Sequence, residues 1–162
     1  MDGNISQALR ILALTHPDHR AEAAASGIMQ NAFDPAYGEA WTPAQLSSFM
    51  MLPDVRLSFA CLDNAYLGFT LTRHVLDEAE LMLIATDPQW QNRGIGQYLL
   101  QDCINHARKS HIGTIHLEVR CNNQAIEFYL RNGFEQVHRR PAYYKGNDGT
   151  YYDALSFRMT LE

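Results

Sequence analysis

The stretch "DPQWQNRGIGQYLLQDCINHARK" (residues 87–109) passes from polar residues through two closely spaced glycines into a segment with helical periodicity. Its apolar residues fall on one stripe, which predicts a helix from Gly94 to Lys109. The stripe contains Ile95, Leu99, Leu100, Cys103, Ile104 and Ala107. Glycine weakens a helix, so Gly94 and Gly96 at its start call for an explanation. A simple turn is one explanation, and a large anion lying against bare backbone is the other.

A helix N-terminus suits an anion because it offers about four unpaired N–H groups and roughly half a positive charge. Phosphate oxygens can use both if no side chain blocks their approach, and glycine removes that obstruction. Polar side chains add donors around the same point: Gln91, Asn92 and Arg93. The stretch is no dinucleotide motif, because Leu99 stands where a third glycine is needed, and it lacks the Lys-Ser/Thr pair of a P-loop.

Length and charge limit the classes of protein to consider. A chain of 162 residues fits one domain, residues 1–162. Its formal net charge is −5. A nucleic-acid partner would favour a basic face, so we expect none, whereas a basic peptide or an amine is permitted as substrate. The oligomeric state cannot be inferred from these totals.

Cysteine usage indicates a reducing compartment. Cys61, Cys103 and Cys121 lie far apart and form no CxxC pair, so we expect neither a disulfide framework nor a metal site. Apolar runs fall short of the roughly 18 residues of a membrane span, and there is no signal-peptide pattern. The expectation is a cytoplasmic protein without a membrane partner.

Periodicity and turn residues predict an α+β fold, a sheet with helices packed on its faces. Thr42, Pro43 and Gln45 form a capping box at one helix start, and Asn122 can cap a later helix that ends before Gly133. The predicted strands are 8–15, 55–63, 65–75, 79–86, 114–120, 134–140 and 150–161, and the predicted helices are 18–32, 42–50, 94–109 and 122–132.

Two segments carry a family resemblance. "IATDPQWQNRGIGQYLL" (84–100) resembles the acetyl-coenzyme A motif of the GCN5-related N-acetyltransferases (GNAT), Q/R-x-x-G-x-G/A, at Gln91, Gly94 and Gly96. "HLEVRCNNQAIEFYLRNGF" (116–134) resembles the second half of the same family. The resemblance implies the GNAT fold, a mixed, mostly antiparallel central sheet flanked by helices on both faces. It also implies acetyl-coenzyme A (acetyl-CoA) as co-substrate.

The resemblance further implies where acetyl-CoA binds. Its pyrophosphate would lie on the backbone amides of Asn92, Arg93, Gly94, Ile95, Gly96 and Gln97. Its pantetheine arm would pair like an added strand along Ile84, Ala85 and Thr86, since a β-edge supplies the donors and acceptors that the arm's amides need. Either Asn122 or Asn123 could be the family's cofactor-contacting asparagine, and helical spacing to Ala125 and Tyr129 favours Asn122.

A closer resemblance, over about residues 32–159, is to the RimI-type group, bacterial enzymes that acetylate the N-terminal alanine of a small-subunit ribosomal protein. That group uses a glutamate as general base through water and a tyrosine to protonate the leaving thiolate. These positions correspond to Glu118 and Tyr129, which are eleven residues apart where twelve is usual. The alternatives are a solvated carboxylate for Glu118 and a core aromatic for Tyr129.

The resemblance leaves the acceptor open. A protein N-terminus, possibly of a ribosomal protein, is the first hypothesis; a small-molecule amine and a coenzyme-A-binding module without turnover are the others. An acidic cluster at Asp77, Glu78 and Glu80 either holds a positively charged substrate or is only a polar hairpin turn. Four tyrosines, Tyr143, Tyr144, Tyr151 and Tyr152, either line a substrate groove or pack on paired strands.

Overall fold

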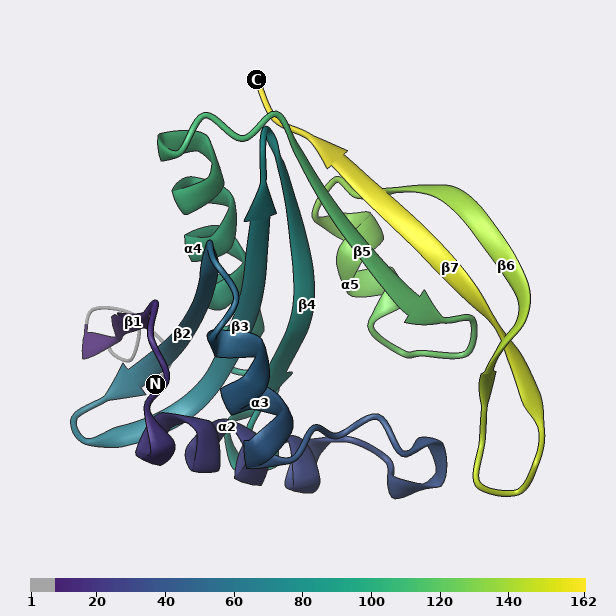
Figure 1. Ribbon diagram of the computed structural model, residues 1–162, viewed down its shortest axis with the longest axis horizontal. Helices are drawn as coiled ribbons and strands as arrows, with labels where there is room; N and C mark the ends of the chain where they lie inside the picture. The colour runs from purple at the N-terminus through teal and green to yellow at the C-terminus, as the bar shows by residue number, and fades with distance from the viewer. Residues whose placement is uncertain (1–7) are drawn as a thin grey trace.

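The computed structural model describes residues 8–162, whose strands form one seven-stranded sheet in the order β1-β2-β3-β4-β5-β7-β6 (Figure 1). Neighbouring strands are antiparallel except β4 and β5, which are parallel. The strands are β1 (Arg10–Leu14), β2 (Val55–Leu62), β3 (Ala65–Val75), β4 (Glu78–Thr86), β5 (Thr114–Arg120), β6 (Glu135–Lys145) and β7 (Tyr151–Thr160). The predicted α+β class and mixed, mostly antiparallel sheet are confirmed.

Helices cover both faces of the sheet. They are α2 (His19–Ala32), α3 (Pro43–Met50), α4 (Ile95–Lys109) and α5 (Ile126–Arg131), with short 3₁₀ turns η1 (Pro35–Tyr37) and η2 (Pro88–Trp90). In Figure 1, α3 lies in front of the sheet and α5 behind it. Across residues 8–162, no helix combines the length and the apolar character needed to cross a bilayer.

Alternating residues of β2 explain the two layers. Leu57 and Phe59 point to one face, where they join a buried cluster with Met29 of α2 and Leu46 of α3. Ala60 points to the other face and packs with helix α4. Strand β2 therefore has apolar residues on both of its faces and is buried between helices.

Pairing between β4 and β5 is short. Only Glu78–Glu80 pairs with Thr114–His116, and the remainder of β4 pairs with β3 alone. On the β3 side, Leu71 faces Leu83 and Thr72 faces Leu81, so Met82 forms a bulge that redirects the strand. Beyond this point β4 and β5 diverge (Figure 1). The divergence leaves backbone N–H and C=O groups of β4 free to pair with something else.

Most predicted elements are confirmed. Helix α4 begins after Gly94 and buries all six residues of the predicted stripe. Helix α3 has the complete capping box between Thr42 and Gln45.

The start of α5 is a correction. The helix begins at Ile126, with Ala125 rather than Asn122 at its N-cap. The chain first makes a turn in which Asn123 N donates to Arg120 O (2.9 Å) and Asn123 Oδ1 accepts from Ala125 N (2.8 Å). This turn occupies the residues that the sequence pattern assigned to the helix. Gly133, with φ of 88°, follows the C-cap as predicted.

Strand β6 is also longer than predicted. It continues past Arg140 to Lys145, with a register shift between Arg140 and Tyr144 where Ala142 has φ of 50°. Pro141 is tolerated because β6 is an edge strand, which needs no N–H on its outer side. The bulge sets the position of the hairpin end that follows.

Gly68 should be sensitive to the smallest possible enlargement. A Cβ there would lie 2.7 Å from the Ala85 carbonyl oxygen and 3.0 Å from Leu99 Cδ1, so β4 or α4 would have to shift. We expect Gly68→Ala to destabilise the fold by about 1–3 kcal/mol in chemical denaturation. The control is Gly27→Ala on α2, where a Cβ meets nothing within 4 Å and should stabilise by about 0.5–1 kcal/mol. Equal stability of the two variants would contradict this packing.

Candidate active site

A cavity of about 1080 Å³ lies where β4 and β5 diverge. Its walls come from Leu81–Thr86 of β4, the start of α4, the end of β5 with the turn into α5, and the loop between α2 and α3. All but one of the residues predicted for the site line it, the exception being Arg93. The lining set is Ile84, Ala85, Thr86, Gln91, Asn92, Gly94, Ile95, Gly96, Gln97, Glu118, Asn122 and Tyr129.

The glycine end of the cavity, residues 94–97, has the features of an anion site. Gly94 is the N-cap of α4 with φ of 82°, and no side chain caps the helix. The first bond of the helix is donated by Tyr98 N to Gly94 O (2.9 Å), so the amides of residues 95–97 precede the intrahelical ladder. The first turn contains no acidic side chain that could compete for these amides.

Gly96 keeps the approach to these amides open. A Cβ at this position would lie 3.7 Å from Thr86 Oγ1 and 3.8 Å from the Phe128 ring. Those distances are ordinary contacts, so a Cβ fits there without a shift, and Gly96 itself lines the cavity. Because position 96 has no side chain, the space next to the start of α4 stays unfilled.

Arg93 lies apart from the other predicted residues. It is outside the cavity lining, and its guanidinium lies over the Trp90 ring at 5.1 Å from the centroid. Its side chain contributes positive charge near the glycine end without forming part of the wall.

Glu118 and Tyr129 reach the cavity from opposite faces of the sheet. Ile115 and Leu117 of β5 are buried against α4 and α5, together with Tyr129. Glu118 alternates with them and therefore points to the other face, toward the loop between α2 and α3. The two side chains can line one cavity because the sheet is open between β4 and β5. The opening is thus a passage through the sheet.

Tyr129 is a buried residue of the cavity wall. The residue is 5% exposed, and its ring packs edge-on against Phe128 and Phe134. Within the described residues its oxygen is not among the fully buried side-chain atoms that lack a hydrogen-bond partner, and the residue lines the cavity. Burial raises the pKa of Tyr129 above its ordinary value, so the group stays a neutral O–H donor.

Glu118 is held by two partners. Arg140 donates from Nη2 to Glu118 Oε2 (2.8 Å), and Ser156 Oγ donates to the same oxygen (3.1 Å). The carboxylate is 20% exposed and the arginine 49%. Burial, and then the charges of Glu118 and Glu39, raise the pKa of Tyr144 to about 12, which keeps its hydroxyl protonated at this end of the cavity.

Sequence reasoning missed much of this carboxylate end, which we define as Tyr37, Glu39, Glu118 and Tyr144. Tyr37 and Glu39 come from the segment between α2 and α3, and their partners lie 85 and 81 positions further along the chain. Of the four predicted groove tyrosines only Tyr144 lines the cavity, and the acidic residues 77, 78 and 80 lie outside its walls. The arginines of β5 and β6 indicate that carboxylate partners lie nearby, because a poorly exposed charge needs a counter-charge, but they do not identify Tyr37 or Glu39 as the residues involved.

Asn122 faces the carboxylate end. Its Oδ1 accepts from Arg120 Nε (2.5 Å), and its Nδ2 donates to the Tyr37 hydroxyl (3.1 Å). Asn123 uses its side chain in the turn before α5. Both asparagines line the cavity, but their amides serve the protein's own contacts here.

Comparison with known sequences gives the class of protein. The sequence profile of the Acetyltransferase (GNAT) family matches residues 15–134. The match spans most of the chain, including β2 to α5 and the whole glycine end. This chain therefore belongs to the GNAT family, whose members use acetyl-CoA.

Comparison with individual proteins shows which kind of GNAT enzyme this chain resembles. The [ribosomal protein bS18]-alanine N-acetyltransferase of Escherichia coli (strain K12) is 40% identical over 95 residues, which are 57% of this chain and 64% of that protein. The chain thus matches less than two thirds of that relative's length. The crystal structure of the E. coli ribosomal-protein-S18-alanine N-acetyltransferase has a TM-score of 0.83 at 30% identity, covering 95% of this chain and 94% of that one.

A more distant structure shares the fold. A GNAT family acetyltransferase from Elizabethkingia anophelis, solved with acetyl-CoA bound, has a TM-score of 0.72 at 19% identity, covering 95% of this chain and 99% of that one.

Replacing Gly96 by leucine should obstruct the glycine end. We expect Gly96→Leu to fold normally, because the position has room, and to weaken acetyl-CoA binding about tenfold or more in calorimetry. Gly27→Leu, at an exposed helical glycine with nothing nearby, is the matched control and should bind like the parent protein. Unchanged affinity in Gly96→Leu would rule out this end of the cavity as the phosphate site.

Proposed function

We propose that this protein transfers the acetyl group of acetyl-CoA to the N-terminal α-amine of a protein, with a ribosomal protein as the first candidate. One observation carries the proposal: Glu118 and Tyr129 line the same cavity although they belong to opposite faces of the sheet. A donor held on the α4 side and an amine arriving on the α3 side would meet between them.

The donor would be held by backbone groups. Residues 92–97 would take the pyrophosphate on free amides and the helix dipole of α4. The edge of β4 at Ile84, Ala85 and Thr86, which has no strand partner on the β5 side within residues 8–162, would pair with the amides of the pantetheine arm. The amides of residues 95–97 precede the intrahelical ladder, and this edge of β4 has β3 on its other side, with the Thr86 carbonyl accepting from Gln91 Nε2 (3.3 Å).

Glu118 is the proposed base for the acceptor. A model α-amine has a pKa of about 8, so roughly a tenth is already neutral at pH 7, and little proton has to be removed. The carboxylate would take the proton from the attacking nitrogen through a water molecule. Arg140 and Ser156 hold one carboxylate oxygen, Oε2, which leaves Oε1 for that water.

Tyr129 is the proposed acid. Attack of the amine on the thioester carbonyl forms a C–N bond, and the C–S bond breaks as the tetrahedral intermediate collapses. The departing thiolate then takes the proton of the Tyr129 hydroxyl, which buried surroundings keep protonated. The proton lost from the amine balances the one that the thiol gains.

Direct attack needs no acyl-enzyme. Burial raises the pKa of Cys103 to about 12, so this thiol is not a nucleophile at neutral pH. Neither Cys103 nor Cys121 lines the cavity. The proposed chemistry therefore uses only the Glu118 carboxylate and the Tyr129 hydroxyl.

The acceptor class follows from two lines of support. The E. coli relative is named an alanine N-acetyltransferase of ribosomal protein bS18, and that protein's structure resembles this chain over nearly its full length. The carboxylate end also offers a wall of tyrosine and carboxylate side chains suited to a cationic N-terminus.

Acceptor choice can be tested with purified protein. We expect acetyl transfer to peptides beginning Ala-Arg, with much lower rates on free polyamines, aminoglycosides, amino acids and lysine side chains. Mass spectrometry of the peptide should place the acetyl group on the α-amine. Turnover restricted to small amines would overturn the protein acceptor and favour a small-molecule acetyltransferase.

Removing each proposed proton carrier should lower kcat. We expect Tyr129→Phe and Glu118→Gln each to reduce kcat about 10²- to 10⁴-fold while the Kd for acetyl-CoA changes less than about twofold. Because burial raises the pKa of Tyr129, its proton is retained as pH rises, and the loss in Tyr129→Phe should be equal at about pH 7 and about pH 9. A normal kcat in Tyr129→Phe would exclude the hydroxyl as acid.

A further inference from the structure

Arg120 is a buried cation at the carboxylate end. Its side chain is 7% exposed, so its charge needs partners within the protein. Arg120 Nη1 donates to Glu39 Oε1, and Arg120 Nε donates to Asn122 Oδ1 (2.5 Å). The guanidinium carbon, Cζ, also lies over the Tyr37 ring, 3.3 Å from its centroid. One side chain therefore holds three others from two separate segments.

The segment that Arg120 holds, residues 34–40, has no buried residue. It includes η1 and lies between α2 and α3, and the apolar residue in it that packs against the α2–α3 core cluster is Ala40, at its end, which is only partly buried. The position of residues 34–39 therefore depends mainly on polar and stacking contacts. Those of Arg120 are central, because they reach both Tyr37 and Glu39.

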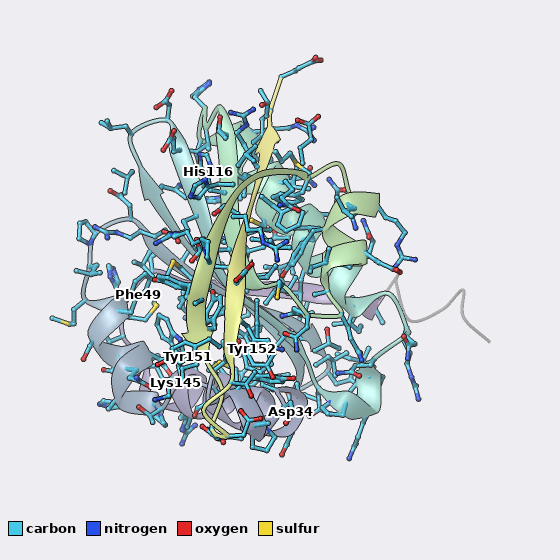
Figure 2. The ribbon with its side chains drawn as sticks, turned by 90° about the vertical axis from the view of Figure 1, so that its right-hand side faces the viewer. Asp34, Phe49, His116, Lys145, Tyr151 and Tyr152 are labelled. Carbon is cyan, nitrogen blue, oxygen red and sulfur yellow. The ribbon has the colours of Figure 1, made fainter. Side chains whose placement is uncertain are left out.

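The hairpin between β6 and β7 supports the same segment from the other side. Asn147 donates from its backbone N to Ala36 O (2.8 Å) and from Nδ2 to Pro35 O (2.7 Å). The Tyr37 ring packs edge-on against Tyr152 at 5.5 Å. Figure 2 shows Tyr152 and Asp34 at the end of the molecule where the hairpin meets this segment. The segment is thus clamped between β5 and the hairpin.

The clamped residues belong to the cavity wall next to Glu118. Arg120 follows Glu118 by two positions on β5 and shares its face of the sheet. Tyr37, Glu39, Arg120 and Asn122 all line the cavity. Glu39 is 29% exposed, and within the described residues only its Oε1 has a partner, which leaves Oε2 for a cationic or N–H-donating acceptor.

We propose that Arg120 is a positioning residue for the acceptor: it fixes segment 34–40, and with it Tyr37 and Glu39, at the place where the amine approaches Glu118. This inference rests on the proposed function. Arginine suits the role because its planar fork pairs with Glu39 and Asn122 while its face stacks on Tyr37. Lysine offers a point charge and cannot make the three contacts together.

The test compares Arg120→Lys and Tyr37→Ala with Arg139→Lys. Arg139 of β6 pairs with Asp153 and lies outside the cavity wall, so it is a matched control for the loss of an arginine. Tyr37→Ala changes an unburied loop residue and keeps the test open if Arg120→Lys folds poorly.

For both test variants we expect the KM for an Ala-Arg peptide to rise about tenfold or more. The kcat at saturating peptide and the Kd for acetyl-CoA should each change less than about threefold. Amide hydrogen exchange of residues 34–40 should become about tenfold faster in Arg120→Lys and stay unchanged in Arg139→Lys. A merely structural role would instead reduce melting temperature, kcat and acetyl-CoA binding together.

Two different results separate failure of this inference from failure of the proposed function. Unchanged peptide KM and unchanged exchange of residues 34–40 in Arg120→Lys would overturn the positioning role while leaving the activity intact. Absence of peptide acetylation by the parent protein would overturn the proposed function, and the exchange measurement would still decide whether Arg120 holds the segment.

Discussion

Backbone pairing between β4 and β5 stops at Glu80, and the rest of the site depends on this interruption. The bulge at Met82 turns β4 away from β5, so its inner edge keeps free N–H and C=O groups. Because the sheet is open there, side chains from both of its faces can line one cavity. A fully paired β4–β5 ladder would separate Glu118 from Tyr129 by a continuous layer of backbone.

Charge balance is the second requirement of the cavity. Three carboxylates line it. Asp34 accepts from Ala36 N, and the other two each have an arginine partner: Arg120 for Glu39 and Arg140 for Glu118. The pairs differ in exposure, since Arg120 is buried and Arg140 is half exposed on the edge strand β6. A buried pair that loses one member leaves an uncompensated charge, whereas an exposed pair can exchange its partner with solvent or with an incoming cation. The buried Arg120–Glu39 pair therefore suits a fixed part of the wall. The more exposed Arg140–Glu118 pair suits a group that contacts substrate.

Local patterns predicted most helices and strands because caps and stripes depend on residues within about four positions. The capping box at Thr42 and the buried stripe of α4 are examples. The predicted start of α5 was wrong because a turn through Asn123 takes the place of the expected first helical turn. The loop residues of the carboxylate end were missed since Glu39 meets Arg120 across 81 positions, a distance at which no short pattern carries information. Family resemblance supplied the roles of Glu118 and Tyr129, which remain predictions.

The central claim is that a donor and an amine meet through the opening between β4 and β5. The most direct measurement is the affinity of a conjugate in which the α-amine of an Ala-Arg peptide is joined through an acetyl linker to the sulfur of coenzyme A. The account predicts that this conjugate binds about 10²-fold tighter or more than coenzyme A alone, because both halves occupy one continuous cavity. An affinity equal to that of coenzyme A, with the peptide half contributing nothing, would contradict it.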